Sequence, residues 1–413
     1  LPVYTILVPL YREANIARKI IPRLIAVDYP RHKLDIKLLL EEDDTATIQA
    51  IRELNLLDYF EVIVVPDSHP KTKPKACNHG LARARGELCV IYDAEDRPEP
   101  DQLKKVVVAF RKAPDKVVCI QAKLNYYNTW QNLLTRFFTV EYSTTFDVVL
   151  PGLQYANIPM PLGGTSNHFR TDVLRELDGW DPFNVTEDCD LGVRIYRAGY
   201  KTSMIDSTTW EEACSNVGGW LRQRSRWVKG FFQTHLTHMR NPLRTFRELG
   251  LRGFIGFLLT VGGSSMMMIL NIFYWIVGGA YLCLMLKAMW HGHGLWEILK
   301  GPRDWLAGSP VWPMIYHGPK EDPLWSTLSV VFFVITVALF FANFLFVLVH
   351  CLAVAKTRMY RLFPYALLMP FYWVLISIGA WKGFIQLFTN PFYWEKTMHG
   401  LSGSAPKKPA RSP

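Results

Sequence analysis

The chain has 413 residues and a formal net charge of +10, from 46 Lys and Arg against 36 Asp and Glu. A positive charge can indicate nucleic-acid binding, but here Lys and Arg are dispersed and no nucleic-acid-binding motif is visible, so nucleic acid is not an expected partner. The seven cysteines contain no CxxC pair, which argues against a zinc site or a disulfide framework and is typical of reduced core cysteines in a cytosolic domain. The length allows two or three domains.

Apolar residues are distributed unevenly along the chain. Residues 1–250 alternate polar and apolar segments, as in a soluble protein, whereas long runs of Phe, Trp, Leu and Met appear from Phe254 onward. We therefore expect a soluble half and a membrane-embedded half, with the positive charge at the membrane surface. No signal peptide is visible, and since the chain begins at Leu1 without Met, further spans upstream stay open.

The first part of the chain predicts alternating strands and helices. The strand candidates are Val3–Val8, Asp35–Leu40, Glu61–Val65, Leu88–Tyr92 and Val117–Gln121, and the helical patterns are Asn15–Val27, Ala46–Leu54, Ala76–Ala84 and Pro100–Lys112. This βαβα order favours an α/β fold with a mostly parallel, doubly wound sheet. Neither GxGxxG nor GxxxxGK followed by Ser or Thr occurs, so acids, lysines and a metal would have to hold a nucleotide.

Three acids follow the strand candidate at Leu88–Tyr92. Asp93, Glu95 and Asp96 come directly after the apolar run, and Pro98 prevents further ladder pairing. Ligands of open α/β sheets lie beyond the carboxyl ends of the strands, and two acids at positions i and i+2 can share a hard divalent cation. One hypothesis is therefore a metal site for a diphosphate. The alternative is a solvated acidic loop that leads into a helix.

Two more acids, Asp43 and Asp44, end the second strand candidate. A carboxylate at this edge of the sheet can accept a hydrogen bond from a base N–H or a ribose hydroxyl. A purely structural role is the alternative, because Asp44 would also serve as the N-cap of the helix that follows.

Two loops carry groups that suit a phosphate or a closely bound ligand. Lys71, Lys73 and Lys75 precede a helix start, where cations and free backbone N–H groups attract phosphate, although such lysines are often simply solvated. The segment 163–168, GGTSNH, offers backbone groups and small hydroxyls for close approach, although a Gly pair also marks an ordinary turn.

The segment 185–191 is predicted to open a helix that runs to about Ala198. Thr186 can cap this helix, and the acids Glu187, Asp188 and Asp190 suit the helix dipole, so a structural role explains all of them. The functional alternative makes Asp188 a general base that takes a proton from an attacking hydroxyl. Spacing alone does not decide between the two.

A basic, aromatic helix is predicted at Val217–Leu236. Gln223, Arg226 and Trp227 stand at i, i+3 and i+4 and share a face, where Trp227 could stack on a sugar and Arg226 could stabilise phosphate charge. The alternative is an amphipathic helix on anionic lipid, and both roles can hold together. Trp130–Leu150 also carries aromatic residues at helical spacing, typical of an interface helix or of a core helix.

Four short motifs follow one another in a recognisable order: Asp43, Asp93-Ala94-Glu95, Thr186-Glu187-Asp188, and residues 223–227, QRSRW. They match the D, DxD, TED and QxxRW motifs of membrane-bound, processive family 2 glycosyltransferases, the group that contains cellulose, hyaluronan and chitin synthases. The chain resembles this group from Pro2 to about Gly400, and its segment 392–400 resembles a tail motif of the bacterial members. Glu95 departs from the usual second Asp but can still reach a cation, and Asp96 is a substitute.

The resemblance implies a GT-A, Rossmann-like domain that faces the cytosol at a bacterial inner membrane, and it implies a role for each motif residue. The nucleotide-sugar would be bound by Asp43, Asp44, Lys75, Asp93, Gln223 and Arg226. Mg²⁺ or Mn²⁺ would be held by Asp93 and Glu95. Asp188 would be the catalytic base, with Glu187 beside it. The acceptor would be bound by Trp227, Gly164, Thr165, Ser166 and Glu187.

The apolar half predicts membrane spans at Ser265–Leu286 and Ser326–Cys351, each near the ~20 residues that cross hydrocarbon. Leu251–Gly263 fits an entry helix or a short crossing, and Leu362–Phe388, broken by Pro370, fits one span or a re-entrant pair. Basic residues place both the loop at 353–361 and the tail in the cytosol, so the number of crossings stays open. The expected regions are a GT-A domain at 1–215, interface helices at 216–250, a transmembrane region at 251–390 and a cytosolic tail at 391–413.

The expected function is inverting transfer of a sugar from a nucleotide-sugar, UDP-glucose or UDP-N-acetylglucosamine, to a growing polysaccharide, with help in its export. Three alternatives stay open. They are a single-sugar transferase acting on a lipid acceptor, a hydrolase, since paired carboxylates also serve glycosidases, and a non-catalytic membrane channel, receptor or scaffold. Export or regulatory proteins are conceivable partners beside the lipid bilayer.

Overall fold

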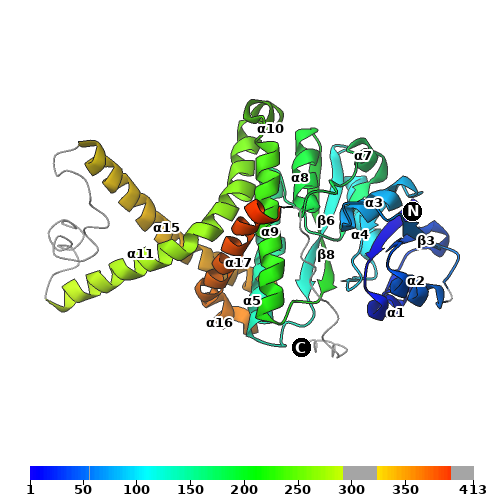
Figure 1. Ribbon diagram of the computed structural model, residues 1–413, viewed down its shortest axis with the longest axis horizontal. Coiled ribbons are helices and arrows are strands. Elements are labelled where there is room, and N and C mark those ends of the chain that lie inside the picture. The colour runs from blue at the N-terminus through cyan, green and yellow to red at the C-terminus, as the bar shows by residue number, and fades with distance from the viewer. Residues whose placement is uncertain (55, 292–322, 392–413) are drawn as a thin grey trace.

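The computed structural model describes residues 1–54, 56–291 and 323–391. An α/β domain forms one end of the molecule, a group of helices lies in the middle, and two long helices project from the other side (Figure 1). The predicted tail motif at 392–400 lies outside the described residues.

Eight strands form one mixed sheet in the order β3-β2-β1-β4-β7-β6-β8-β5. Their bounds are β1 Tyr4–Leu10, β2 Leu34–Glu41, β3 Phe60–Val65, β4 Leu88–Ile91, β5 Arg97–Pro98, β6 Val117–Tyr126, β7 Asn167–Arg170 and β8 Lys201–Glu211. The pairs among β3, β2, β1 and β4 are parallel, as is β6 with β8, whereas β7 is antiparallel to both β4 and β6. The predicted α/β fold and its five strands are confirmed, and β7 together with β5, which is antiparallel to β8, makes the sheet mixed. The expectation that Pro98 prevents further ladder pairing was wrong, because Pro98 lies in β5 opposite Thr209.

The helices of the α/β domain begin within a few residues of the predicted patterns, except the short helix Thr171–Glu176, which was not predicted. Their bounds are α1 Ala14–Ile25, α2 Thr45–Arg52, α3 Lys73–Ala82, α4 Gln102–Lys112, α7 Thr171–Glu176 and α8 Glu187–Arg197. The helices that follow the sheet strands in the middle of the molecule are α5 Leu133–Thr144, continued by η2 Thr145–Val149 and α6 Leu150–Tyr155, and α9 Val217–His238.

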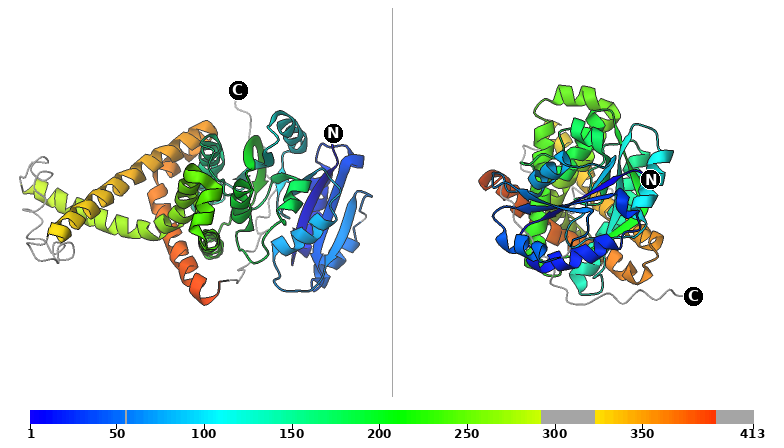
Figure 2. Two further views of the ribbon diagram at one scale, coloured as in Figure 1. Left: turned by 90° about the horizontal axis from the view of Figure 1, so that it is seen from above. Right: turned by 90° about the vertical axis from the view of Figure 1, so that its right-hand side faces the viewer.

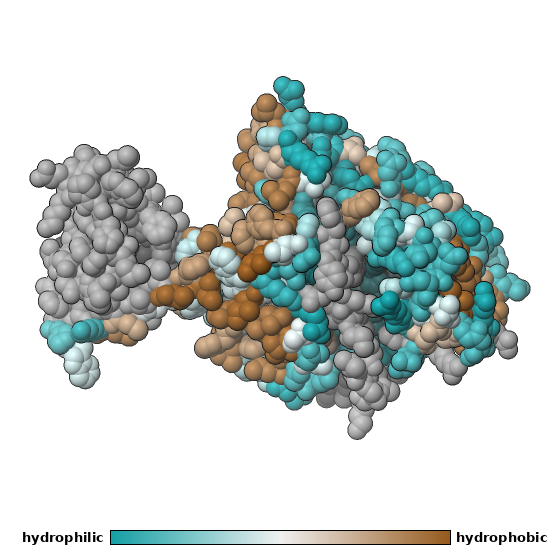
Figure 3. Space-filling view, in the orientation of Figure 1, coloured by the Kyte–Doolittle hydropathy of each residue, from teal (hydrophilic) through white to brown (hydrophobic). Residues whose placement is uncertain are grey.

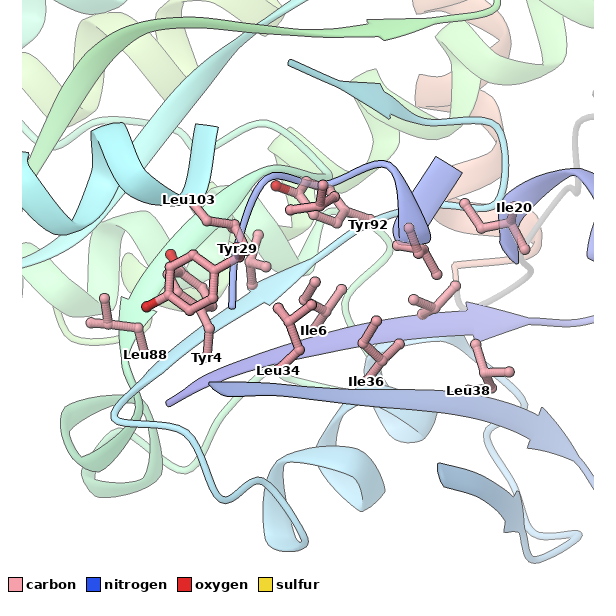
Figure 4. Packing of buried hydrophobic residues seen from close by; sticks show 14 of the residues in the cluster. Tyr4, Ile6, Ile20, Tyr29, Leu34, Ile36, Leu38, Leu88, Tyr92 and Leu103 are labelled. Atoms are coloured by element: carbon pink, nitrogen blue, oxygen red, sulfur yellow. The ribbon is translucent and has the colours of Figure 1, made fainter. Parts of the chain in front are cut away.

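One apolar core holds the central strands in place. Tyr4 and Ile6 of β1 and Leu34 and Ile36 of β2 alternate along their strands, so they point to the same side of the sheet and are at most 4% exposed (Figure 4). Burial of each such side chain contributes ~1.5–3 kcal/mol. This packing fixes the carboxyl ends of the strands, where the acids of the candidate site begin.

The apolar half consists of α10 Pro242–Phe257, η3 Leu258–Gly263, α11 Ser264–Trp290, α15 Pro323–Lys356, η4 Tyr360–Leu362, α16 Phe363–Leu367 and α17 Met369–Thr389. Pro370 lies in the first turn of α17, where its missing N–H costs no hydrogen bond. It therefore starts a helix instead of breaking one. Within the described parts of the chain, Pro242–Ile276 and Met369–Thr389 are long and apolar enough to cross a membrane, and Phe341–Lys356 is a shorter apolar helix.

These helices run in two directions. α11 and α15 project together from the body of the molecule, whereas α9, α10 and α17 run across their direction (Figures 1 and 2). The surface around α17 and the beginning of the projecting helices is hydrophobic, and the α/β domain is mainly hydrophilic (Figure 3). The segment 130–150 packs as a core helix, because Phe137 and Phe138 of α5 are buried in one cluster with Tyr372 of α17.

Candidate active site

The loop after β4 is held in place by a buried carboxylate. Asp96 is fully buried, and its Oδ2 accepts hydrogen bonds from the Asp93 backbone N–H at 2.8 Å and from the Thr165 hydroxyl. Burial and the charges of Asp93 and Glu95 raise the pKa of Asp96. The Asp96 carboxylate thus has a structural role, because it ties the loop to Thr165. Asp93 and Glu95 line the cavity beside it.

A cavity of about 350 Å³ lies beside this loop. It brings together residues from the ends of the strands, from α8 and α9, and from the beginning of α11. Its charged and amide lining residues are Lys73, Asp93, Glu95, Glu141, Glu187, Asp188, Glu211, Glu212, Gln223, Arg224 and Arg226, and Trp227 lies among them. Three of the four sequence motifs therefore face one cavity.

Lys73 lies at the acidic side of the cavity. Its ammonium is 2.5 Å from Asp93 Oδ1 and donates to the Gly164 carbonyl at 2.7 Å. Burial disfavours the charged form, but the charges of Asp93 and Glu187 outweigh it, and the pKa of Lys73 is raised. A fixed positive charge between the end of β4 and the beginning of α8 can bind an anionic group such as a diphosphate.

Lys75, the lysine that the family resemblance indicated, is used differently. It is buried, forms an ion pair with Glu41 at 2.8 Å, and donates to the carbonyls of Pro66 and Ser68, both at 3.1 Å. These contacts hold the loop after β3 against the end of β2. Lys75 is not among the residues that line the cavity.

The acids at the end of β2 divide between two roles. Asp44 is the N-cap of α2, where its Oδ1 accepts from the Thr47 N–H at 3.2 Å. Asp43 stays 30% exposed, and its Oδ2 accepts from Lys71 at 2.8 Å and from the Tyr11 hydroxyl at 3.2 Å. The hydrogen bond from Lys71 lowers the pKa of Asp43. Both acids lie outside the cavity lining.

The first turn of α8 places two adjacent acids on the cavity. Asp188 Oδ1 accepts from the Cys189 N–H at 2.7 Å, and a Cβ added at Gly164 would lie 3.4 Å from its Oδ2. Burial raises the pKa of Asp188 to about 6 and that of Glu187 to about 7. A carboxylate with such a pKa can accept a proton near neutral pH.

The helix α9 presents Gln223, Arg226 and Trp227 to the same cavity. Close packing sets its position, because a Cβ at Gly230 would collide with the side chain of Thr186 at the start of α8. Burial lowers the pKa of Arg226, while the charges of Glu187 and Asp188 oppose this effect. A guanidinium, an amide and an indole thus lie on the side of the cavity formed by α9.

Only some residues of the glycine segment before β7 line the cavity. Gly164 and Thr165 line the cavity. Ser166 is fully buried, donates to the Thr209 hydroxyl at 2.7 Å and lies outside the lining. Its backbone has a φ of 57°, a conformation that turns the chain into β7.

Four charged lining residues were not singled out from the sequence: Glu141 of α5, Arg224 of α9, and Glu211 and Glu212 at the end of β8. Burial and the charges of Asp96, Glu95 and Asp93 raise the pKa of Glu211. Arg224 stands inside the QxxRW pattern, which is a signal that could have found it. No local signal marks Glu211 or Glu212, because the strand before them was not predicted.

Of the three carboxylates on the loop after β4, Asp93 and Glu95 line the cavity and could reach a divalent cation, whereas Asp96 is buried. Within residues 1–54, 56–291 and 323–391 no three His, Cys, Asp or Glu side chains converge as a metal site. Mg²⁺ and Mn²⁺ prefer oxygen ligands, and Mg²⁺ in particular is often bound by one or two carboxylates together with substrate phosphates. Asp93 and Glu95 therefore fit a cation that arrives with a diphosphate better than a cation held by protein alone.

A family model described as "Glycosyltransferase like family 2" matches residues 2–230. Among curated proteins, the probable glycosyltransferase YdaM of Bacillus subtilis is 27% identical over 238 residues, which are 56% of this chain and 55% of that protein. Probable glucomannan 4-beta-mannosyltransferases 3 and 7 of Oryza sativa are each 26% identical over 238 residues, 55% of this chain and 43% and 40% of theirs. The chain spans about half the length of these relatives or less.

Solved structures also resemble the chain at low sequence identity. The mannosyltransferase PcManGT from Pyrobaculum calidifontis, in complex with GDP-Man and Mn²⁺, is 18% identical with a TM-score of 0.49, covering 82% of this chain and 86% of that one. TarS from S. aureus, residues 1–349 in complex with UDP, is 12% identical with a TM-score of 0.44, covering 64% of this chain and 74% of that one.

Proposed function

Because this chain belongs to glycosyltransferase family 2, we propose that it transfers a sugar from a nucleotide-sugar to a polysaccharide acceptor at a membrane, with inversion at the anomeric carbon. The observation that carries the proposal is the single cavity that joins Asp93, Asp188 and Trp227. It supplies a diphosphate side, a base and an aromatic platform. UDP-glucose and UDP-N-acetylglucosamine are the expected donors, and GDP-mannose joins them because two relatives are named glucomannan mannosyltransferases.

The donor's diphosphate would lie between Lys73 and Arg226. Both cations line the cavity, and their positive charges would stabilise the negative charge that develops as the diphosphate leaves. Gln223 would add an amide donor on the same side. A Mg²⁺ or Mn²⁺ ion held by Asp93 and Glu95 would further neutralise the diphosphate. Asp43 would contact the nucleoside beyond the cavity, at the end of β2.

Asp188 would act as the general base. Its carboxylate lines the cavity, and its raised pKa of about 6 leaves it ionised at neutral pH but still basic enough to take a proton. The acceptor hydroxyl would lose its proton to Asp188 as its oxygen attacks C1 of the donor sugar. The bond from C1 to the diphosphate breaks on the opposite side, which inverts the configuration. Glu187 and Thr165 would bind acceptor hydroxyls, and Trp227 would stack on the sugar.

The direction of the helices supports an arrangement at the membrane. If α11 and α15 cross the bilayer as a pair, α9, α10 and α17 lie along its surface, since they run across that pair (Figures 1 and 2). The exposed side of α17 then faces lipid through Phe371, Ile378 and Ile385, which are 72%, 48% and 56% exposed. This arrangement would leave the loop before η4 and the end of α17 on one side of the membrane, in agreement with the basic residues that the sequence carries in the 353–361 loop and in the tail.

The cavity also reaches the apolar half. Ser264, Ser265 and Met268, at the beginning of α11, line it beside Trp227. A growing sugar chain would therefore leave the site next to the projecting helices, which supports a role for them in export. The apolar side chains of Phe231 and Met268 in the same lining favour a lipid-linked acceptor as the second candidate.

One experiment separates these possibilities. The full chain in membrane vesicles is incubated with UDP-glucose, UDP-N-acetylglucosamine or GDP-mannose and Mn²⁺, and released nucleotide and product size are measured. A polymer supports the proposal. A glycolipid with one added sugar identifies the second candidate. If no nucleotide is released from any of the three donors, the proposal that the chain transfers sugar from one of them is contradicted.

A further inference from the structure

An ion pair between two cavity-lining residues, Arg224 and Glu141, lies next to the indole of Trp227. Arg224 donates from Nη1 and Nη2 to the two carboxylate oxygens of Glu141 at 2.7 and 2.6 Å. Its guanidinium lies 4.9 Å from the centre of the Trp227 ring, and the side chain is 5% exposed. A planar, bidentate guanidinium against an indole is a rigid contact that Lys could not reproduce.

A third residue completes this group from a distant part of the chain. The hydroxyl of Tyr372, on α17, donates to Glu141 Oε2 at 2.7 Å and accepts from Arg224 Nη2 at 3.2 Å and from the Trp220 indole N–H at 3.1 Å. Tyr372 is 2% exposed and is not among the cavity-lining residues. It therefore links α17 to α5 and α9 behind the site without touching the cavity.

The packing of α17 leaves this group little freedom. A Cβ at Gly379 would lie 2.9 Å from Arg224 Cγ, so only glycine lets the helix come this close to the arginine. The ring of Tyr372 is stacked on Phe137 at 5.5 Å, and Phe138 lies 5.9 Å from Trp227 between ring centres. Close packing of this kind transmits a shift of one side chain to the next.

We propose that Tyr372 is a positioning residue, which through Arg224 and Glu141 holds the indole of Trp227 in the orientation that binds the acceptor sugar. The proposal rests on the proposed function and adds that the docking of an apolar helix sets the acceptor side of the cavity. A bound sugar gains from a platform that is already oriented, because no freedom is lost when it stacks. In the part of the chain that the structure describes, the hydrogen bonds of Lys73 and Asp93 on the donor side go to Gly164, Asp96 and each other and not to this group.

The test is a double-mutant cycle of Tyr372→Phe and Trp227→Phe, with donor and acceptor kinetics measured on the full chain in vesicles. The acceptor probe is a short oligosaccharide of the sugar transferred. Tyr372→Phe keeps the ring and removes the hydroxyl, so we expect the acceptor KM to rise about threefold to tenfold, as for one lost hydrogen bond, and the donor KM to stay unchanged. In the Trp227→Phe background, Tyr372→Phe should have no further effect on the acceptor KM.

The matched control is Tyr365→Phe on α16. Its hydroxyl accepts from Arg136 Nη1 at 2.7 Å, so the same chemical change removes a similar contact away from the cavity. We expect wild-type acceptor KM for this variant. An equal rise in both donor and acceptor KM for Tyr372→Phe, or the same rise whether or not Trp227 is present, would overturn the proposal.

A readout without turnover separates this proposal from the proposed function. With 5-fluorotryptophan in the protein, the ¹⁹F resonance of Trp227 is assigned by its loss in Trp227→Phe. It should shift or broaden in Tyr372→Phe and stay in place in Tyr365→Phe. An unmoved resonance overturns the positioning role, whereas a moved resonance in a protein without transferase activity overturns the proposed function alone.

Discussion

Lys73 and Asp93 form an ion pair of 2.5 Å just beyond the carboxyl end of the strand β4. The same ammonium donates to the Gly164 carbonyl at 2.7 Å, so one cation joins the acidic loop to the glycine segment before β7. Asp93 is also one of the two carboxylates proposed to hold a divalent cation. A metal ion bound there would therefore compete with the ammonium for one carboxylate, and a bound diphosphate would resolve the competition by drawing the ammonium to its own oxygens.

Replacing Lys73 with Gln should separate the two effects of this ammonium. We expect the donor KM to rise about tenfold or more, since a hydrogen bond to a charged group contributes ~1.5–3 kcal/mol. Mn²⁺ should bind more tightly when nucleotide is absent, because Asp93 no longer shares its charge with Lys73. Donor kinetics and titration of Mn²⁺ by electron paramagnetic resonance measure the two.

The control is Lys104→Gln, which removes a comparable ion pair, 2.6 Å to Asp28, on the exposed side of α4. Both quantities should stay at their wild-type values there. Weaker Mn²⁺ binding by Lys73→Gln would contradict the competition.

Asp188→Asn keeps the shape of the side chain and removes its basicity. We expect turnover to fall by ~2–4 orders of magnitude, as for other general bases, while the nucleotide-sugar still binds. Turnover and donor affinity, the latter by calorimetry, measure the two effects. Asp172→Asn makes the same change at an exposed acid in the first turn of α7 and should be neutral. Near-normal turnover of Asp188→Asn would remove Asp188 from the mechanism.

The pH dependence of the reaction should follow the pair in the first turn of α8. Burial raises the pKa of Asp188 to about 6 and that of Glu187 to about 7. Because a general base must be ionised, kcat/KM should rise with pH through an apparent pKa between these values, which belongs to the pair and not to one residue. A profile that stays flat across the pKa values of about 6 and about 7 would contradict this assignment.

The same two pKa values predict that the stability of the fold falls as pH rises, whereas the activity rises. Each is raised above the ordinary value, so the folded state binds more protons than the unfolded chain, and stability falls as pH rises through the pKa of about 6 for Asp188 and about 7 for Glu187. Asp188→Asn removes one of the buried charges. Its Tm should therefore exceed that of the wild type in mildly alkaline buffer and approach it in acidic buffer, where the wild-type carboxyl is protonated.

The sequence was most informative where local pattern and burial agree. The strands β1, β2 and β4 appear as apolar runs because both of their faces are covered. β7 was missed since its four residues, Asn167–Arg170, are mainly polar. Three of them, Asn167, His168 and Phe169, are buried all the same, and His168 shares a hydrogen bond of 2.7 Å with the Tyr4 hydroxyl. Such partners lie far away in the chain, and no local pattern reveals them.

The choice between the lysines shows a second limit. Lys73 and Lys75 belong to one basic stretch that was predicted as a loop, and in a loop nothing distinguishes one lysine from the other. In the structure α3 begins at Lys73, and residues two apart on a helix point in nearly opposite directions, about 200° around the axis. Only Lys73 can face the cavity, and Lys75 turns to Glu41 instead. A helix boundary that shifts by two residues is therefore enough to change the residue assigned to the site.

Gly383→Ala tests whether α17 is docked on α9 as described. An added Cβ would lie 2.5 Å from the Ser225 carbonyl oxygen and 3.3 Å from the Lys229 nitrogen, both in the backbone of α9. Backbone inside a helix cannot move aside, so α17 itself would have to shift, and we expect a loss of ~1–3 kcal/mol in stability. Thermal unfolding in detergent and the acceptor KM are the measurements. The acceptor KM should rise with the displacement, because Tyr372 moves with the helix.

The matched control is Gly279→Ala in α11, where an added Cβ meets no atom within 4 Å. The two substitutions are chemically identical and both lie in apolar helices, so they share the gain of up to ~1 kcal/mol that Ala has over Gly in a helix. Only the contact with α9 distinguishes them. If Gly383→Ala were as stable as Gly279→Ala, α17 would not be seated against Ser225, and the link from Tyr372 through Arg224 to Trp227 would lose its support.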